Sequence, residues 1–214
     1  VNAPHWQLSM GTIPTLDSIH LGVGQAYNEI RPQFADLDAD GDLDLLISSR
    51  WNYTGHHKLD DLHFYRNIGS VTNPIFTLDT IPGLESQQVA EFTSAGFGDL
   101  DNDGDIDIVM GGSDSCTYFE NIGTATSPSY IRAYGSSSLF PPTQWVESSF
   151  LLPTVDLEDF DNDGDLDLYF MNEAGFIRYI PNNGTPTTPN FSPYASYPAH
   201  SFDTVDFGAF VTMA

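Results

Sequence analysis

The sequence predicts an all-β protein built from a repeated unit of about four strands. Short runs rich in β-branched and aromatic residues, such as LDLLISS from Leu43 and LDLYFMN from Leu166, are bounded by Gly, Asn, Ser and Asp. The 18 Gly and 14 Pro are spread along the chain, as many tight turns require. No segment keeps the apolar period of an amphipathic helix over a useful length.

An acidic segment recurs three times without gaps, and its first Asp residues lie 63 and 60 residues apart. The copies read FADLDADGDLDLLI from Phe34, FGDLDNDGDIDIVM from Phe97 and LEDFDNDGDLDLYF from Leu157. A second motif follows each copy, as FYRNIGSVTNPIF from Phe64, YFENIGTATSPSY from Tyr118 and YIPNNGTPTTPNF from Tyr179. It reads as an aromatic strand, an Asn/Gly turn and a strand that begins at Pro. A repeat of this length with several strands per unit is typical of a β-propeller, whose blades have four strands.

We expect residues 1–214 to form a single propeller region, with three complete blades and a partial blade at each end. The Pro-x-aromatic strand occurs four times, first at Pro4, and FDTVDFGAFV from Phe202 repeats the strand before the loop without its acids. The expected blocks are a blade remnant at 1–30, blades with an acidic loop at 31–80, 90–133 and 150–195, and a partial blade without that loop at 200–214. Open sheet edges pair readily with other chains. We therefore expect a part of a longer propeller, or one completed by oligomerisation.

The charge of the chain excludes two classes of partner. Thirty acids against 6 bases give a formal net charge of −24, which opposes binding to nucleic acid and to anionic membrane surfaces. No apolar stretch is long enough for a transmembrane helix, so no membrane insertion is expected. Half of the acids, 15, lie in the three acidic loops. Like charges packed so closely repel, so the loops call for a counter-cation.

Each loop spans nine positions with the pattern D-x-D-x-D-G-D-x-D, from Asp36 to Asp44 in the first copy. Ca²⁺ takes six to eight oxygen ligands. Carboxylates at positions one, three and five can converge on an ion when Gly at position six permits a sharp turn. Position seven would then offer its backbone carbonyl, and position nine would close the shell. Mg²⁺ prefers water-rich octahedral sites, and Zn²⁺ prefers His and Cys, which the loops lack. The sequence therefore predicts three calcium ions.

Apolar residues alternate with the acids at positions two and eight of each loop. We expect them to pack under the loop into the core. They are Leu37, Leu43, Leu100, Ile106, Phe160 and Leu166.

These motifs resemble the calcium loops of the FG-GAP/VCBS repeat family, found in integrin alpha-chain propellers and in secreted bacterial proteins. The Asn-Ile-Gly connection from Asn67 and from Asn121 is similar to that of the bacterial branch. The resemblance implies a β-propeller with one calcium ion between the first two strands of a blade. The side-chain ligands it implies are Asp36, Asp38, Asp40 and Asp44, then Asp99, Asp101, Asp103 and Asp107, then Asp159, Asp161, Asp163 and Asp167. Backbone carbonyls would come from Asp42, Asp105 and Asp165.

The function expected from the resemblance is a calcium-binding module of a secreted or cell-surface protein. It would bind a glycan or a protein ligand outside the cell, or mediate adhesion, with calcium stabilising the blades. Two alternatives stay open, a non-catalytic part of a secreted polysaccharide-degrading enzyme and a purely structural spacer. We expect no catalysis by the chain itself, since it has no G-x-S-x-G or H-E-x-x-H motif and Cys116 has no His nearby in the sequence.

The first unit carries an insertion between its acidic loop and its Asn/Gly turn. The span from position nine of the loop to the Gly of the turn is 25 residues, against 16 and 17 in the other units. Loops on a rigid scaffold often carry binding residues. The candidates for stacking on a sugar and for hydrogen bonding are Trp51, Tyr53, His56, His57 and Asp60.

Overall fold

The chain folds into antiparallel β-sheets. The computed structural model describes residues 27–51, 62–84, 94–111, 116–133, 154–171 and 177–191, and these residues contain strands and turns but no helix. The all-β prediction is therefore confirmed for this part of the chain. Most of the expected blade remnant at 1–30 and all of the expected partial blade at 200–214 lie outside the described residues.

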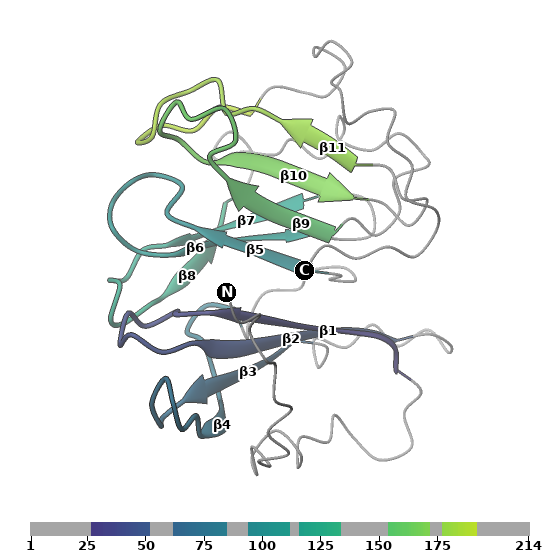
Figure 1. Cartoon of the computed structure of the whole chain (residues 1–214), viewed down its shortest axis with the longest axis vertical. Coiled ribbons are helices and arrows are strands. Elements are labelled where there is room, and N and C mark those ends of the chain that lie inside the picture. The colour runs from purple at the N-terminus through teal and green to yellow at the C-terminus, as the bar shows by residue number, and fades with distance from the viewer. Residues whose placement is uncertain are drawn as a thin grey trace, which may run out of the picture.

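Three sheets follow one another along the chain, each from one copy of the repeat (Figure 1). The first contains β1 (Tyr27–Ala35), β2 (Asp44–Trp51), β3 (Leu62–Asn67) and β4 (Phe76–Asp79). The second contains β5 (Ser94–Gly98), β6 (Asp107–Gly111), β7 (Cys116–Asn121) and β8 (Tyr130–Arg132). The third contains β9 (Thr154–Glu158), β10 (Asp167–Met171) and β11 (Ile177–Ile180). Neighbouring strands within each sheet are consecutive in sequence, so every sheet is a meander.

The expected four strands per unit are present in the first two sheets. In the third, the described residues form three strands, and an isolated antiparallel bridge joins Asn182 to Phe191. In the second sheet Asn121, the counterpart of Asn182, pairs with Tyr130 of β8. The bridge thus stands where a fourth strand begins in the other units.

Strand β6 of the middle sheet is buried on both of its faces, and its alternate residues point to opposite sides. Ile108 and Met110 pack against Leu46 of the first sheet. Val109, between them, packs against Leu168 of the third sheet. One strand therefore supplies side chains to two intersheet cores, which holds the three sheets in succession.

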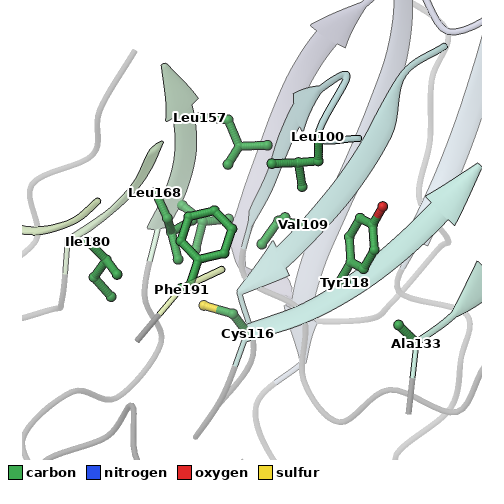
Figure 2. Packing of buried hydrophobic residues seen from close by; sticks show 10 residues of the cluster. Leu100, Val109, Cys116, Tyr118, Ala133, Leu157, Leu168, Ile180 and Phe191 are labelled. Atoms are coloured by element: carbon green, nitrogen blue, oxygen red, sulfur yellow. The ribbon is translucent and has the colours of Figure 1, made fainter. Parts of the chain in front are cut away.

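The core between the second and third sheets includes the free cysteine of the chain. Figure 2 shows Phe191 beside Leu168 and Cys116, with Val109 across from them. Cys116 is buried, and burial raises the pKa of its thiol to about 12. A thiol of that kind behaves as a small apolar side chain rather than as a nucleophile.

The first strands of the three sheets lie close together and are joined by polar side chains. The Gln33 side chain on β1 accepts a hydrogen bond from the Ala95 backbone N–H at 2.5 Å and donates one to its carbonyl. Ser94 Oγ on β5 accepts a hydrogen bond from the Val155 N–H of β9 at 2.8 Å. These bonds tie each first strand to the next.

A hydrogen bond between residues far apart in the sequence joins the first sheet to the third. Arg31 on β1 donates a hydrogen bond to Thr154 Oγ1 on β9, 123 positions away in the chain. β5 and β9 also approach closely, since a Cβ added at Gly96 would lie 3.2 Å from the Cα of Asp156. The first strands of the three units, β1, β5 and β9, therefore lie next to one another.

The Asn/Gly turn owes its shape to the Asn side chain and to close backbone packing. Asn121 Oδ1 accepts the N–H groups of Gly123 and Ser129, both at 3.0 Å. Asn67 and Asn182 make the same pairs of bonds in the other units. A Cβ at Gly123 would lie 2.4 Å from the Ser127 carbonyl oxygen. This is a steric clash that only a movement of the backbone could relieve.

We expect Gly123→Ala to lower the free energy of unfolding by about 2 kcal/mol or more, because the new methyl group meets backbone rather than a movable side chain. Thr124→Ala in the same turn is the matched control, since Thr124 is exposed and its turn bonds are made by its backbone. The measurement is urea unfolding of the three proteins. Equal midpoints for Gly123→Ala and Thr124→Ala would contradict this account of the turn.

Candidate metal centre

Each acidic loop connects the first strand of a sheet to the second and turns on two residues with positive φ. Position six is Gly in every copy, with φ of 95° at Gly41 and 97° at Gly104 and Gly164. Position four is also left-handed, with φ of 52° at Ala39, 58° at Asn102 and 61° at Asn162. Asn tolerates this conformation better than Ala does. The first loop therefore adopts the shared turn with a less suitable residue.

The aspartates at positions one and five build the turn by accepting backbone hydrogen bonds. In the second loop, Asp99 Oδ1 accepts the Asp103 N–H and Asp99 Oδ2 accepts the Gly104 N–H, both at 3.0 Å. Asp103 Oδ1 then accepts the Asp105 N–H at 3.1 Å. The other two loops repeat these bonds at 3.0–3.2 Å. The chain is thereby wrapped around its own carboxylates.

This wrapping brings the carboxylates at positions one, three and five together. In each loop, one oxygen atom from each of the three lies within 4.8 Å of the others. Oxygens that share one calcium ion, each about 2.3–2.6 Å from it, stand at such separations. The clusters are Asp36, Asp38 and Asp40, then Asp99, Asp101 and Asp103, then Asp159, Asp161 and Asp163.

Buried carboxylate oxygens without a hydrogen-bond donor adjoin these clusters. Position seven is buried in all three loops, with exposed fractions of 7% for Asp42, 6% for Asp105 and 5% for Asp165. Oδ1 of each has no hydrogen-bond partner, and the same holds for Oδ1 of Asp38 and of Asp101. A buried anionic oxygen without a donor is unfavourable unless a cation satisfies it. The donor set therefore suits a hard cation.

Position nine has a different part in the structure. Both oxygens of Asp107 accept protein hydrogen bonds: Oδ2 from the Leu100 N–H at 3.1 Å and the Tyr118 hydroxyl at 3.0 Å, and Oδ1 from the Asn121 N–H at 2.8 Å. The same backbone bonds hold Asp44 and Asp167, and all three side chains are 1% exposed. Position nine ties the loop to the end of the third strand. Its predicted place as a metal ligand stays a prediction.

Burial shifts the titration of the carboxylates at positions seven and nine. Loss of hydration is the largest cause at every one of them, and it raises the pKa of Asp44, Asp105 and Asp165 to about 6 and that of Asp107 to about 7. Repulsion from neighbouring aspartates adds to the rise, whereas backbone N–H donors oppose it at position nine. These carboxyls would therefore begin to bind protons below about pH 7, so protons and a metal ion would compete for the loops.

Two of the six apolar loop residues are not in the core as expected. Leu37 and Leu100, at position two, are buried against the following sheet, but Phe160 at position two of the third loop is 47% exposed. Among the described residues no sheet follows the third. Phe160 instead packs on its own sheet, with its ring 5.4 Å from that of Tyr169 and 5.5 Å from that of Tyr179.

Leu43, at position eight of the first loop, is exposed for the same reason as Phe160: the described residues include no sheet on that side. Ile106 and Leu166 are partly buried against the sheet that precedes their own, and a Cβ at Gly98 of β5 would lie 2.4 Å from Leu166 Cδ1. Leu43 belongs to the first sheet, which no sheet precedes in the described part of the chain, and it is 54% exposed. Positions two and eight therefore pack in opposite directions along the row of sheets.

Most of the predicted ligand-binding insertion lies outside the described residues. Trp51 is the last residue of β2, and nothing is described of its side chain. Tyr53, His56, His57 and Asp60 fall outside the description. The suggestion that this loop binds a ligand stays a prediction.

The sequence reasoning missed two kinds of residue at the loops. The Asn at or just after the end of the third strand donates its N–H to position nine, and its recurrence in all three copies of the second motif was a usable signal. Arg66, in contrast, contacts Asp38 of the first loop across the sheet and has no counterpart of like charge in the other copies. Nothing local in the sequence indicated that contact.

Comparison with known proteins adds no support for the resemblance to the FG-GAP/VCBS repeats, which rests on the motifs of the sequence alone. No model of a protein family matches the sequence, and no curated protein matches it either. In the part of the chain that the structure describes, none of the residues belongs to a helix able to cross a membrane.

We expect Asp107→Ala and Asp103→Ala to differ in how they depend on calcium. Asp107→Ala strips the acceptor from buried N–H and hydroxyl donors, so it should lower the free energy of unfolding by about 3 kcal/mol in EDTA as well as in calcium. Asp103 is exposed and accepts one backbone bond, from the Asp105 N–H, so Asp103→Ala should cost at most about 1 kcal/mol in EDTA and more in calcium. The measurement is denaturant unfolding in both conditions. A large loss for Asp103→Ala in EDTA would contradict this division of roles.

The raised pKa values predict opposite pH dependences with and without calcium. Carboxyls with a pKa of about 6 to 7 in the folded chain and near 3.8 in the unfolded chain bind more protons in the folded chain. Stability in EDTA should therefore fall as pH rises from about 4 to about 7. Calcium binds the ionised carboxylates, so the stabilisation it adds should grow over the same range. Melting temperatures at several pH values, with EDTA and with excess calcium, check both slopes.

Proposed function

We propose that the chain is a calcium-binding β-propeller module that takes one Ca²⁺ in each of its three acidic loops. The observation that carries the proposal is threefold repetition of one geometry. In each loop three carboxylates converge within 4.8 Å, and a position-seven carboxylate oxygen is buried without a donor. A solvated acidic turn would leave its oxygens exposed to water instead of burying them.

The ligand chemistry favours calcium over other divalent ions. The clusters contain carboxylates alone, without His or Cys, so zinc and the softer transition metals are disfavoured. Magnesium keeps several waters in strict octahedral geometry. A flexible loop rich in carboxylate and carbonyl oxygen suits the larger calcium ion with its higher coordination number.

The arrangement of the sheets supports a propeller, in which the first strand of every blade lines the central axis. The first strands β1, β5 and β9 are the ones joined by polar side chains between sheets. The loop residues at positions two and eight pack forward and backward onto neighbouring sheets, as blades in a ring do. Leu43 and Phe160 are exposed on the outer faces of the described row of sheets, which suits a longer propeller or one completed by oligomerisation.

In the proposed function, calcium holds the blades and the module binds a glycan or protein ligand, or mediates adhesion, outside the cell. The folded loop binds the ion better than the unfolded chain does, so calcium stabilises the fold by mass action. Modules of this kind work at the high calcium concentrations found outside cells. The insertion of the first unit, from Trp51 to Asp60, is the candidate ligand surface because it is absent from the other units.

A glycan array probed with and without EDTA tests the ligand half of the proposal. Sugar binding that is lost in EDTA and in a Trp51→Ala variant supports the candidate surface. Equal sugar binding by native protein and that variant would place the ligand elsewhere. Discovery of a catalytic domain in the same polypeptide would favour the carrier of a polysaccharide-degrading enzyme.

We expect isothermal titration of the metal-free protein to give three calcium ions per chain. At a free concentration 100-fold above Kd, each site should add about 2.7 kcal/mol to the free energy of unfolding. Asp103→Ala should remove one ion and leave the others. A titration without heat, together with equal melting temperatures in calcium and EDTA, would show that the loops hold no calcium.

A further inference from the structure

One arginine is fixed against the first acidic loop. Arg66 lies on β3, where Nη1 donates to Asp38 Oδ2 in the loop and Nε donates to Asp79 Oδ2 on β4 at 2.8 Å. Its guanidinium also stands over the Phe64 ring, 5.5 Å from the centroid. The side chain is 28% exposed. Contacts to a loop, a neighbouring strand and a ring hold the positive charge in one place.

The other two loops have no such cation at the equivalent position. The strand register pairs Leu45 with Tyr65, Ile108 with Phe119 and Leu168 with Ile180, so the residue after each third-strand partner is equivalent. That residue is Arg66 in the first unit, Glu120 in the second and Pro181 in the third. Three nearly identical acidic loops therefore have an arginine, a glutamate and a proline at this position.

The arginine occupies one oxygen of a cluster carboxylate and leaves the other free. Asp38 Oδ2 accepts the bond from Arg66, while Asp38 Oδ1 is buried and has no partner. A cation can thus still reach the first cluster through Oδ1. It would do so against the repulsion of a guanidinium on the same carboxylate.

We propose that Arg66 is the resident cation of the first loop, which holds that loop closed without metal and weakens its calcium affinity so that it fills last. This inference rests on the proposed calcium function. It assigns the first loop a lower calcium affinity than the other two in spite of their shared sequence, and it makes Arg66 the residue that sets this difference.

A purely orienting role for the arginine is the competing explanation, and it would strengthen calcium binding. The second loop argues against it, because Asp101 Oδ1 is likewise buried without a partner in a unit that has Glu120 in place of Arg66. Charge is then the larger effect. In a dielectric like that of water, the repulsion between a guanidinium and a divalent ion about 5–6 Å apart lowers the affinity for the ion about tenfold.

The test is calcium titration of metal-free native protein and of Arg66→Met, whose flexible apolar side chain can keep contact with Phe64. We expect two tight sites and one weak site in the native protein, and the weak site should tighten about tenfold in the variant. Melting in EDTA should show the opposite effect, a lower midpoint for Arg66→Met. Asp40→Ala, which disables the first cluster, should abolish the weak site and leave the tight ones.

Two further variants separate charge from shape. Arg66→Lys keeps the charge without the planar fork, so its weak site should stay weak. Glu120→Arg places a guanidinium beside the second loop and should create a second weak site, whereas Glu120→Gln should leave that loop tight. An unchanged or weakened site in Arg66→Met would overturn the role of Arg66 while leaving three calcium sites in place. Native protein that binds no calcium would instead defeat the proposed function itself.

Discussion

The structure depends on one buried carboxylate in each unit, the aspartate at the last position of the acidic loop. Asp107 receives the Leu100 N–H from the start of the loop, and the Asn121 N–H and Tyr118 hydroxyl from β7. It thereby sets the distance between the loop and the third strand. The side chain of Asn121 then shapes the turn that follows. The two motifs of the repeat are thus parts of one hydrogen-bonded assembly.

This constraint also creates the electrostatic problem that the loops must solve. Burying position nine removes water from its carboxylate and raises the pKa of Asp107 to about 7. The neighbouring carboxylates converge because the backbone wraps around Asp99, and Asp105 is buried next to them without a donor for Oδ1. The hydrogen bonds that fix the backbone of the loop therefore also bring its negative charges together. A divalent ion would neutralise these charges without changing the backbone hydrogen bonds.

The sequence was sufficient for features that depend on local pattern. Alternating apolar residues and the gapless acidic repeat predicted an all-β chain with about four strands per unit and the carboxylates that converge. It was insufficient where the outcome depends on which sheet lies next door. Phe160 has the same local pattern as Leu100, and Leu43 has that of Ile106, but both are exposed on faces where the described residues include no neighbouring sheet. The contact of Arg66 with Asp38 is likewise non-local, 28 positions apart in the chain.

Repeats of one motif therefore need not be equal sites. The first unit has Phe64 where the second has Tyr118, so Asp44 has no tyrosine hydroxyl like the one that reaches Asp107. The backbone bond to Oδ2 is also longer, 3.3 Å from Leu37 against 3.1 Å in the second loop. A loop with fewer donors on its anchoring carboxylate gains most from a cation that is always present. Arg66 supplies that cation in the one unit where the anchor is weakest.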